Sequence, residues 1–311
     1  MLYIVIGIAL FCLTLKGYCG KRLSCFVDDA GDTYLFNFLR MVFCSLIGAA
    51  LVFFEVGAGF IVADIGMLLI CALSGFSNAA FLVGWMLAIQ RNSMVSVDVA
   101  LTLGSLIPSL LCMLLFSEPI SLLKMIGFAL ILLSTFTLAG HNKKTKGGGL
   151  IGTLLLVFAA VGDGISGFAQ QLYKQYYTDA GGRSQGIFYP KTVYHFYTYV
   201  FAALILLIVL VFYRMRHAKS NPEKKGVFST SPRALLHILI MAICLFAANY
   251  FQTVATNDYG MSSQMLYPII KGGCLITVNF TAALCFGEKL TLRCVLGSLI
   301  ALVGIISMSI L

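Results

Sequence analysis

Charged residues are scarce in this chain: they make up 11% of its 311 positions, whereas apolar residues make up 60%. A soluble domain usually carries about 25% charged residues. No soluble fold of this length has enough interior to cover so much apolar surface. The composition therefore excludes an ordinary soluble protein and predicts one whose solvent is the lipid bilayer.

Recognisable catalytic and metal-binding patterns are also missing. The four histidines are scattered, and no CxxC or Cys/His cluster has metal-ligand spacing. The three glycines at 147–149 lack the Lys-Ser/Thr of a phosphate loop. The ten cysteines lie mostly inside apolar runs, where cysteine behaves as a small buried hydrophobe. We therefore predict no enzyme activity, no cofactor and no metal site.

The net charge of +9 does not indicate a nucleic-acid partner. The Lys and Arg residues lie in short gaps between apolar runs, which is typical of the cytoplasmic loops of membrane proteins. The partners predicted instead are the lipid bilayer and a small-molecule substrate.

Ten apolar runs are long enough to cross a hydrocarbon core of about 30 Å, which takes about 20 helical residues. Their predicted bounds are 2–20, 33–56, 61–90, 93–117, 121–140, 149–175, 188–213, 233–257, 260–287 and 290–311. The sequence thus predicts an all-α polytopic membrane protein with ten transmembrane helices.

Basic residues are distributed unevenly over the gaps between these runs. The gaps after odd-numbered helices carry 14 Lys and Arg residues, and those after even-numbered helices carry 4, namely Lys124, Lys174, Arg183 and Lys191. The positive-inside rule places the richer side in the cytoplasm. Both chain termini are then expected on the opposite side.

An internal repeat relates the two ends of the sequence. At an offset of 170 residues, Glu118 aligns with Glu288 and Gly127 with Gly297. Five helices per half is an odd number, so the halves have opposite orientations, which is an inverted-topology repeat. The expected organisation is a first repeat over 1–140, a linker at 141–148 and a second repeat over 149–311. The two glutamates are expected to cap the helices that follow them, and the glycine-bearing fifth and tenth helices could pack against another copy in a homodimer.

The segment LCFGEKLTLRCVLGSLIALVGIISM resembles the closing stretch of the EamA-like branch of the drug/metabolite transporter superfamily. The run SSQMLYPIIKGGCLI resembles the ninth helix of bacterial members. The first copy of the turn motif departs from the pattern, with Ser117 for Gly and Pro119 for the basic residue. The resemblance implies metabolite transport by alternating access, in a multi-pass protein of the cell membrane, typically the bacterial inner membrane. Members often place the N-terminus inside, opposite to the charge distribution here.

Lys271 is the most informative ionisable residue. It lies about ten residues into the ninth helix, at a depth of about 15 Å, where a charge is costly. Tyr267 and Pro268 precede it and two glycines follow it, a pattern similar to the discontinuous helices of transporter binding sites. Lys271 is predicted to hold an anionic substrate group, the alternative being an interhelical ion pair.

Two carboxylates could partner that lysine. Asp163 lies well inside the sixth helix and Asp98 one to two turns into the fourth. Each is a candidate for proton coupling or for a permanent ion pair. Arg40, two turns into the second helix, is predicted to form an ion pair or to snorkel, and Lys16 is predicted to snorkel to the cytoplasmic interface.

Polar and aromatic side chains on several helices could line the same cavity. Asn78 and Trp85 are seven residues apart and share a face of the third helix. The other candidates are Tyr267 on the ninth helix, Gln170 on the sixth, and Asn249 and Gln252 on the eighth. The alternative for the amides is mutual hydrogen bonding between helices.

The function predicted from these features is that of a secondary transporter for a small polar or amphiphilic metabolite, anionic or zwitterionic, with a proton as one candidate coupling ion. A non-transport membrane scaffold or sensor and a lipid flippase remain as alternatives. A continuous polar cavity favours transport, dry apolar packing favours a scaffold, and a lateral slit favours lipid substrates.

Overall fold

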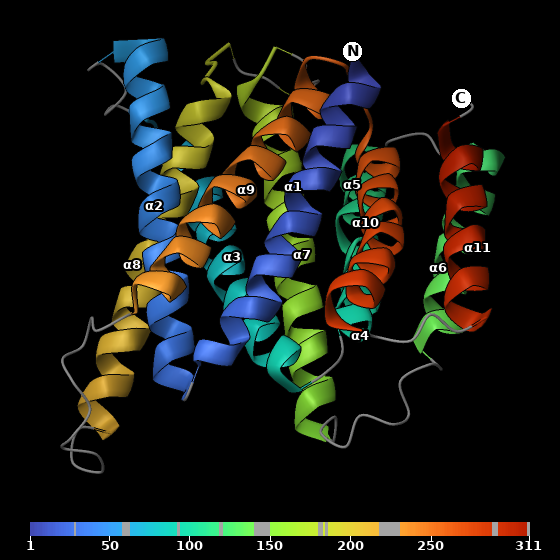
Figure 1. Cartoon of the computed structure of the whole chain (residues 1–311). Helices are drawn as coiled ribbons and strands as arrows, with labels where there is room; N and C mark the ends of the chain where they lie inside the picture. Colours follow the sequence, from blue (N-terminus) through green and yellow to red (C-terminus); the bar gives the residue numbers. More distant parts are fainter. Residues whose placement is uncertain are drawn as a thin grey trace.

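A computed structural model describes residues 1–27, 29–57, 63–91, 94–117, 121–139, 150–179, 183, 186–217, 231–287 and 292–309. All regular elements within these ranges are helices (Figure 1). They are α1 (Leu2–Leu23), the short 3-10 helix η1 (Ser24–Phe26), α2 (Ala30–Val56), α3 (Ile65–Arg91), α4 (Met94–Gly104), α5 (Leu106–Phe116), α6 (Leu122–Ala139), α7 (Leu150–Tyr177), α8 (Lys191–His217), α9 (Pro232–Asn257), α10 (Ser263–Phe286) and α11 (Leu292–Ser309).

The chain is a multi-pass α-helical membrane protein. Eight helical segments within the described ranges are long and apolar enough to cross a bilayer, and α6 and α11 contain shorter apolar stretches, Met125–Ser134 and Val295–Ser307. Large apolar side chains cover the outer surface; Phe54 and Leu284 are 84% and 83% exposed. Helices suit this solvent because each bonds its own backbone polar groups, which lipid cannot do.

Local hydrogen bonds define several helix ends. The second helix begins at Ala30, earlier than predicted, because Asp29 and Asp32 form a capping box with bonds of 2.9 and 3.3 Å. Ser117 and Gly287 end α5 and α10 in the left-handed conformation, with φ of 54° and 64°. The predicted caps Glu118 and Glu288, and the predicted linker 141–148, lie outside the described residues.

The fourth predicted span is broken at Ser105, between α4 and α5. Pro108 explains the break, because it has no N–H to donate to the carbonyl of Gly104 and its ring would clash there in a continuous helix. Two hydroxyls bond backbone carbonyls around the break: Ser105 Oγ donates to Thr102 O at 2.7 Å, and Ser109 Oγ to Ser105 O at 3.0 Å. The predicted discontinuity in the ninth helix is wrong: α10 runs unbroken through Pro268, although proline removes one backbone donor there.

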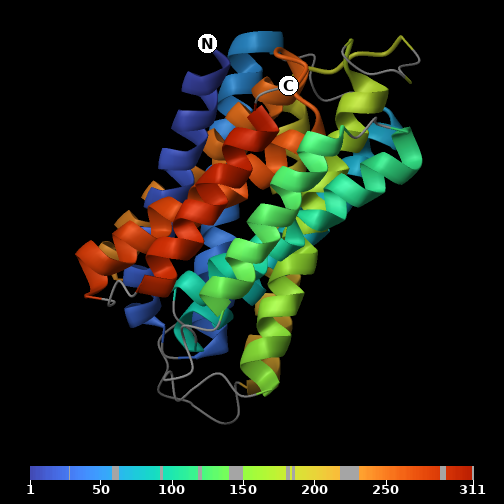
Figure 2. The same cartoon turned by 90° about the vertical axis from the view of Figure 1, so that its right-hand side faces the viewer.

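Four long helix pairs form the frame: α3 with α7, α1 with α9, α2 with α8, and α6 with α11. Figures 1 and 2 show α6 and α11 side by side at one edge of the bundle. Helices α4 and α10 contact each other and connect this edge pair to α7 and α1, respectively. Every long pair joins helices distant in sequence, so the space between them is bordered by both halves of the chain.

Orientation can be tested at the two ends of α8. Ile187 precedes this helix and is 47% exposed, and Met215 lies near its other end and is 73% exposed. In a background without native cysteines, Ile187→Cys is expected to react with an impermeant thiol reagent added outside intact cells, and Met215→Cys only after permeabilisation, because basic residues concentrate on the Met215 side. The reverse labelling pattern would contradict the charge-based orientation.

Candidate functional site

A small polar cavity lies in the middle of the bundle, between helices of both halves. Its free volume is about 50 Å³, which holds a handful of water molecules. Its lining comes from α1 (Leu13, Lys16), α3 (Ser74, Asn78, Phe81), the α4–α5 break and α5 (Ser105, Pro108), α7 (Asp163, Gly164, Ser166, Gly167, Gln170), α8 (Tyr194, His195, Thr198), α9 (Leu245, Asn249, Gln252) and α10 (Tyr267, Lys271). We call it the central cavity.

An ion pair crosses this cavity between α7 and α10. Lys271 Nζ lies 2.5 Å from Asp163 Oδ2, and the two side chains are 15% and 19% exposed. Both residues line the cavity, so the pair borders open space and is not enclosed on all sides by packed side chains. Such a pair can exchange one partner for a bound ligand without a charge being transferred into a fully apolar environment.

The sequence Gly162–Asp163–Gly164 explains why Asp163 reaches the cavity. A Cβ on Gly162 would lie 2.7 Å from the backbone nitrogen of Phe81 on α3, and one on Gly164 would lie 2.6 Å from the carbonyl oxygen of Gly104 on α4. Only hydrogen fits at either position. The two glycines therefore let α7 approach α3 and α4 closely, with the carboxylate of Asp163 between them.

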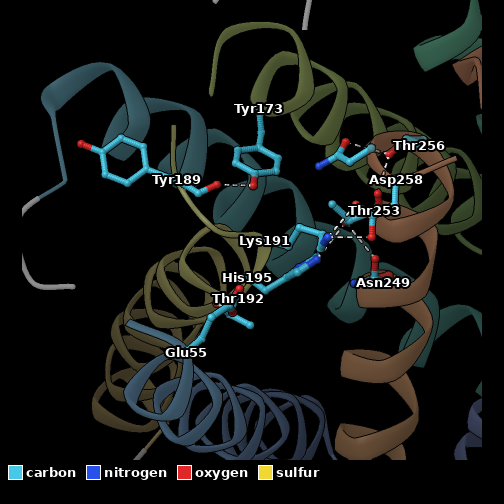
Figure 3. Close-up of polar contacts among 11 residues, drawn as sticks. Glu55, Tyr173, Tyr189, Lys191, Thr192, His195, Asn249, Thr253, Thr256 and Asp258 are labelled. Atoms are coloured by element: carbon cyan, nitrogen blue, oxygen red, sulfur yellow. Dashed lines mark hydrogen bonds and ion pairs between the residues drawn. The ribbon is translucent and has the colours of Figure 1, made fainter. Parts of the chain in front are cut away.

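Hydroxyls and amides form a bonded network at one end of the cavity. Tyr267 OH donates to Gly167 O at 2.7 Å and bonds Gln170 Oε1 at 3.0 Å, and Gln170 Nε2 donates to Thr253 Oγ1. Thr253 also bonds His195 Nε2 at 2.9 Å, a contact visible in Figure 3. The network joins α7, α8, α9 and α10, so these helices fix one another's polar faces.

An aromatic layer separates the central cavity from a larger opening. Tyr173 and Tyr194 stack with ring centroids 4.5 Å apart, and Tyr173 OH donates to Tyr189 O at 2.7 Å (Figure 3). Beyond the layer is a vestibule of about 560 Å³. Its lining consists of Glu55, Tyr173, Tyr177, Thr178, Asp179, Phe188, Tyr189, Pro190, Lys191, Asn257 and Asp258.

Polar contacts hold the walls of this vestibule together. Lys191 Nζ pairs with Asp258 Oδ1 at 2.7 Å, and Thr192 Oγ1 donates to Glu55 Oε2 at 2.6 Å (Figure 3). These contacts connect α8 with the ends of α9 and α2. The closure at this end therefore depends on one stacked aromatic layer and a few polar contacts.

A second cavity, of about 30 Å³, adjoins the central one. Lys16, Leu13 and Lys271 line both cavities, and the second is completed by Gly17, Trp85, Asp98, Leu101, Cys274 and Val278. Beyond Trp85 the helices are closed by an apolar cluster that includes Leu23, Leu82 and Met86, all 0% exposed. This end is packed with buried apolar side chains, whereas the vestibule end has the stacked pair of Tyr173 and Tyr194.

The structure brings nearly all predicted site residues to these two cavities. Seven line the central cavity: Asn78, Asp163, Gln170, Asn249, Gln252, Tyr267 and Lys271. Trp85 and Asp98 line the second cavity. Of the two candidate carboxylates, Asp163 pairs with Lys271, whereas Asp98 forms no ion pair among the described residues.

Arg40 departs from its predicted role. It is 0% exposed, which contradicts snorkelling, and its three guanidinium nitrogens have no hydrogen-bond partner among the described residues, which contradicts an ion pair. The carbon Cζ lies 5.6 Å from the ring centroid of Trp85 instead. A basic residue two turns into a helix can reach the interface only from a lipid-facing side, and Arg40 points inward.

Lys16 was assigned wrongly to the interface. Its side chain is 7% exposed and lines both cavities. Helix α1 continues to Leu23, about 10 Å beyond Lys16, which places the ammonium deeper than the length of the apolar run suggests. The flanking Gly17 and Gly20 were the available signal, since small residues mark an inward-facing helix surface; a Cβ on Gly20 would overlap the ring of Trp85.

Comparisons with known proteins extend to the fold alone. No protein-family model matches the chain, and no curated protein is similar to it in sequence. A solved structure described only as a crystal structure of a protein superposes with a TM-score of 0.68, covering 98% of each chain at 10% sequence identity. At that identity the similarity concerns the architecture and carries no function. Within the described ranges, no cluster of three or more His, Cys, Asp or Glu residues could hold a metal ion.

Proposed function

We propose that the protein is a secondary transporter whose substrate is a small metabolite with an anionic group. The observation that carries this proposal is the Lys271–Asp163 pair, which borders a polar cavity enclosed by helices from both halves of the chain. In the proposed cycle the anionic group of the substrate replaces Asp163 as the partner of Lys271. The displaced carboxylate then takes up a proton, which couples transport to proton movement.

The lining of the cavity favours transport over a scaffold. A structural ion pair is expected to be surrounded by dry packing, whereas Lys271 and Asp163 share their space with hydroxyls and amides that can bond a polar ligand. Asn78 donates to Ser166 Oγ at 2.7 Å and Asn249 to Tyr199 OH at 2.9 Å. Both amides also retain an oxygen that can accept a bond from a ligand.

The size of the cavity indicates a closed state in the transport cycle. Ligand pockets usually measure about 300–1,000 Å³, and the central cavity offers about 50 Å³. A metabolite therefore requires the helices to separate. The single aromatic layer of Tyr173 and Tyr194 is the thinner barrier, so we infer that opening begins toward the vestibule.

We further propose ten membrane spans in two inverted five-helix halves, with α4 and α5 together forming the fourth span. Under this proposal α1 corresponds to α7, α3 to α9, and α4–α5 to α10. The packing supports this correspondence, because a contact in one half has its counterpart in the other. The contact of α3 with α7 corresponds to that of α9 with α1, and the contact of α4 with α7 corresponds to that of α10 with α1. The left-handed ends at Ser117 and Gly287 are also 170 residues apart, the offset of the sequence repeat.

A lipid flippase is the second candidate, and one observation favours it. An apolar groove of about 440 Å³ lies between α4 and α7 and includes Leu103, Ile107, Leu156 and Val157. Such a groove could hold an acyl chain while a headgroup enters the central cavity. Movement of fluorescent phospholipids between the leaflets of proteoliposomes would distinguish this candidate from a transporter of soluble metabolites.

The proposed function is tested by ligand-dependent thermal stability. Purified protein is screened against small carboxylates, sugar acids and amino acids, and a ligand is expected to raise Tm by mass action, with about 2.7 kcal/mol of stabilisation at 100 times Kd. Ligands found this way are then tested for uptake into proteoliposomes.

A set of matched variants tests whether the ligand response depends on Lys271. The Lys271→Met/Asp163→Asn double variant removes both charges together and is expected to fold, yet to lose the ligand response and uptake. Lys271→Arg is expected to retain part of both. Arg91→Met, at an exposed position on α3, is expected to behave as the parent. A full ligand response in the well-folded double variant would overturn the role of Lys271.

A further inference from the structure

Lys16 is a buried cation that forms no ion pair with any carboxylate of the described residues. Its side chain is 7% exposed and lines both cavities. Its ammonium lies 5.1 Å from the ring centroid of Phe81 and 5.5 Å from that of Trp85. It makes no hydrogen bond or ion pair within the described part of the chain. Aromatic faces contribute about 0.5–2 kcal/mol to a cation, which is less than the cost of removing an ammonium from water.

Arg40 adds a second cation on the same indole. Its guanidinium is fully buried and lies 5.6 Å from the ring centroid of Trp85. The Nε, Nη1 and Nη2 atoms have no hydrogen-bond partner in the part of the chain that the structure describes. Trp85 is thus in contact range of two cations, Lys16 and Arg40, and is itself 3% exposed. The indole separates Arg40 from the second cavity, which Trp85 and Lys16 line.

The charges around the two cavities do not cancel. The charged groups that line the cavities are Lys16, Lys271, Asp98 and Asp163, two of each sign. Arg40, on the other side of the Trp85 ring, adds the one positive charge in excess. Asp163 is committed to Lys271. Asp98 lines the second cavity without an ion pair among the described residues. In a low-dielectric interior an uncompensated charge attracts a counter-ion strongly.

We propose that the second cavity, between Lys16, Trp85 and Lys271, binds a monovalent anion. The ligand chemistry is a single negative charge of small size, either a halide or the carboxylate of a small organic acid. The free volume of about 30 Å³ has room for about two water molecules, which suits a halide or one carboxylate group. This site goes beyond the proposed function, because it exists whether or not the protein transports anything.

The sequence supplies a reporter for this site. Trp85 is the only tryptophan in the chain, so the intrinsic tryptophan fluorescence arises from the wall of the second cavity. Purified protein is titrated with sodium bromide or with sodium acetate, at constant ionic strength in sodium methanesulfonate. A bound anion is expected to change the emission along a saturating curve, whereas collisional quenching rises linearly with concentration.

Three variants link the signal to the site. Lys16→Met is expected to weaken binding at least tenfold, and Lys16→Arg to remain within a few-fold of the parent. Arg91→Met, on the same helix as Trp85 but exposed at its end, is expected to leave binding unchanged. Asp98→Asn removes the opposing charge from the cavity and is expected to tighten binding about tenfold.

The titrations with bromide and with acetate identify the kind of anion that binds. Saturation by bromide alone supports an inorganic anion, saturation by acetate alone supports a carboxylate, and saturation by both supports a general monovalent site. The absence of saturation by either in the parent protein, or an unchanged affinity in Lys16→Met, overturns the proposal. Should Lys16→Met not fold, an Asp98→Asn protein whose affinity is unchanged or weaker overturns it equally. If the Trp85 fluorescence shows saturable anion binding while the thermal screen finds no ligand, the anion site holds and the proposed transport function does not.

Discussion

Replacing Lys271 by methionine is expected to lower the free energy of unfolding by about 3–5 kcal/mol, because Asp163 is left charged and without its partner in the interior of the bundle. The two groups are 2.5 Å apart and only 15% and 19% exposed. Removing the Lys271 ammonium therefore abolishes the attraction between the two charges, while the cost of desolvating the Asp163 carboxylate remains. The measurement is equilibrium unfolding in mixed micelles with increasing SDS.

Two variants control for this effect. Adding Asp163→Asn to Lys271→Met removes the orphaned charge and is expected to restore most of the lost stability. Lys191→Met breaks the vestibule pair with Asp258, whose side chains are 22% and 45% exposed. Because exposed pairs contribute about 0–1 kcal/mol, this variant is expected to stay close to the parent. Equal losses in Lys271→Met and Lys191→Met would mean that the central pair is no better shielded than a surface pair.

Lys16 provides an informative contrast to Lys271. Both are lysines that line the two cavities, but only Lys271 has a carboxylate within 4 Å in the described structure. Loss of the Lys16 ammonium breaks no ion pair among the described residues, so stability does not depend on it in the same way. The two lysines thus differ in what they hold: one stabilises the empty protein, and the other is available for an anion from outside.

Depth along an apolar run was sufficient to single out Lys271 and its two candidate partners, Asp98 and Asp163, from the sequence. Lys271 and Asp163 both fall near the middle of long runs, and a charge at that depth needs a partner. Helical spacing likewise placed Asn78 and Trp85 on one face of α3, and they line adjoining cavities. These inferences succeeded because they depend on the position of a residue within its own helix.

Contacts between helices could not be derived in the same way. The sequence does not specify which carboxylate lies beside Lys271, and Asp98 and Asp163 were equal candidates until packing separated them. The inward direction of Lys16 and Arg40 depends on how α1 and α2 rotate against Trp85. Rotation about a helix axis is set by all neighbours together, and no single run of residues records it.

The break between α4 and α5 was also missed, although its cause is local. The predicted span 93–117 passes through Pro108 without interruption, and proline is tolerated in transmembrane helices. The structure places the consequence four residues earlier, at Gly104 and Ser105. The run of Gly104, Ser105 and Pro108 was the available signal, because it combines a residue with little helix preference with one that removes a backbone bond.

The contact between Gly104 and α7 is also expected to be sensitive to substitution. A Cβ on Gly104 would lie 2.4 Å from Ala160 O, 3.0 Å from Ala160 C and 3.1 Å from its Cα. All three are backbone atoms, so no side-chain rotation can relieve the overlap. Gly104→Ala must push α4 away from α7 and is expected to cost about 1–3 kcal/mol or more.

Gly7→Ala is the matched control for this substitution. Gly7 lies in α1, and a Cβ there would meet no heavy atom within 4 Å. Alanine favours helix over glycine by roughly 0.5–1 kcal/mol, so Gly7→Ala is expected to be neutral or stabilising in the same SDS titration. The displacement of α4 in Gly104→Ala should also change the second cavity, because α4 carries Asp98, which lines it. Gly104 itself lines the apolar groove and faces Gly164, which lines the central cavity. We therefore expect Gly104→Ala to alter the Trp85 fluorescence as well as the stability. If Gly104→Ala has the same stability and emission as the Gly7→Ala control, α4 and α7 do not approach each other through these glycines.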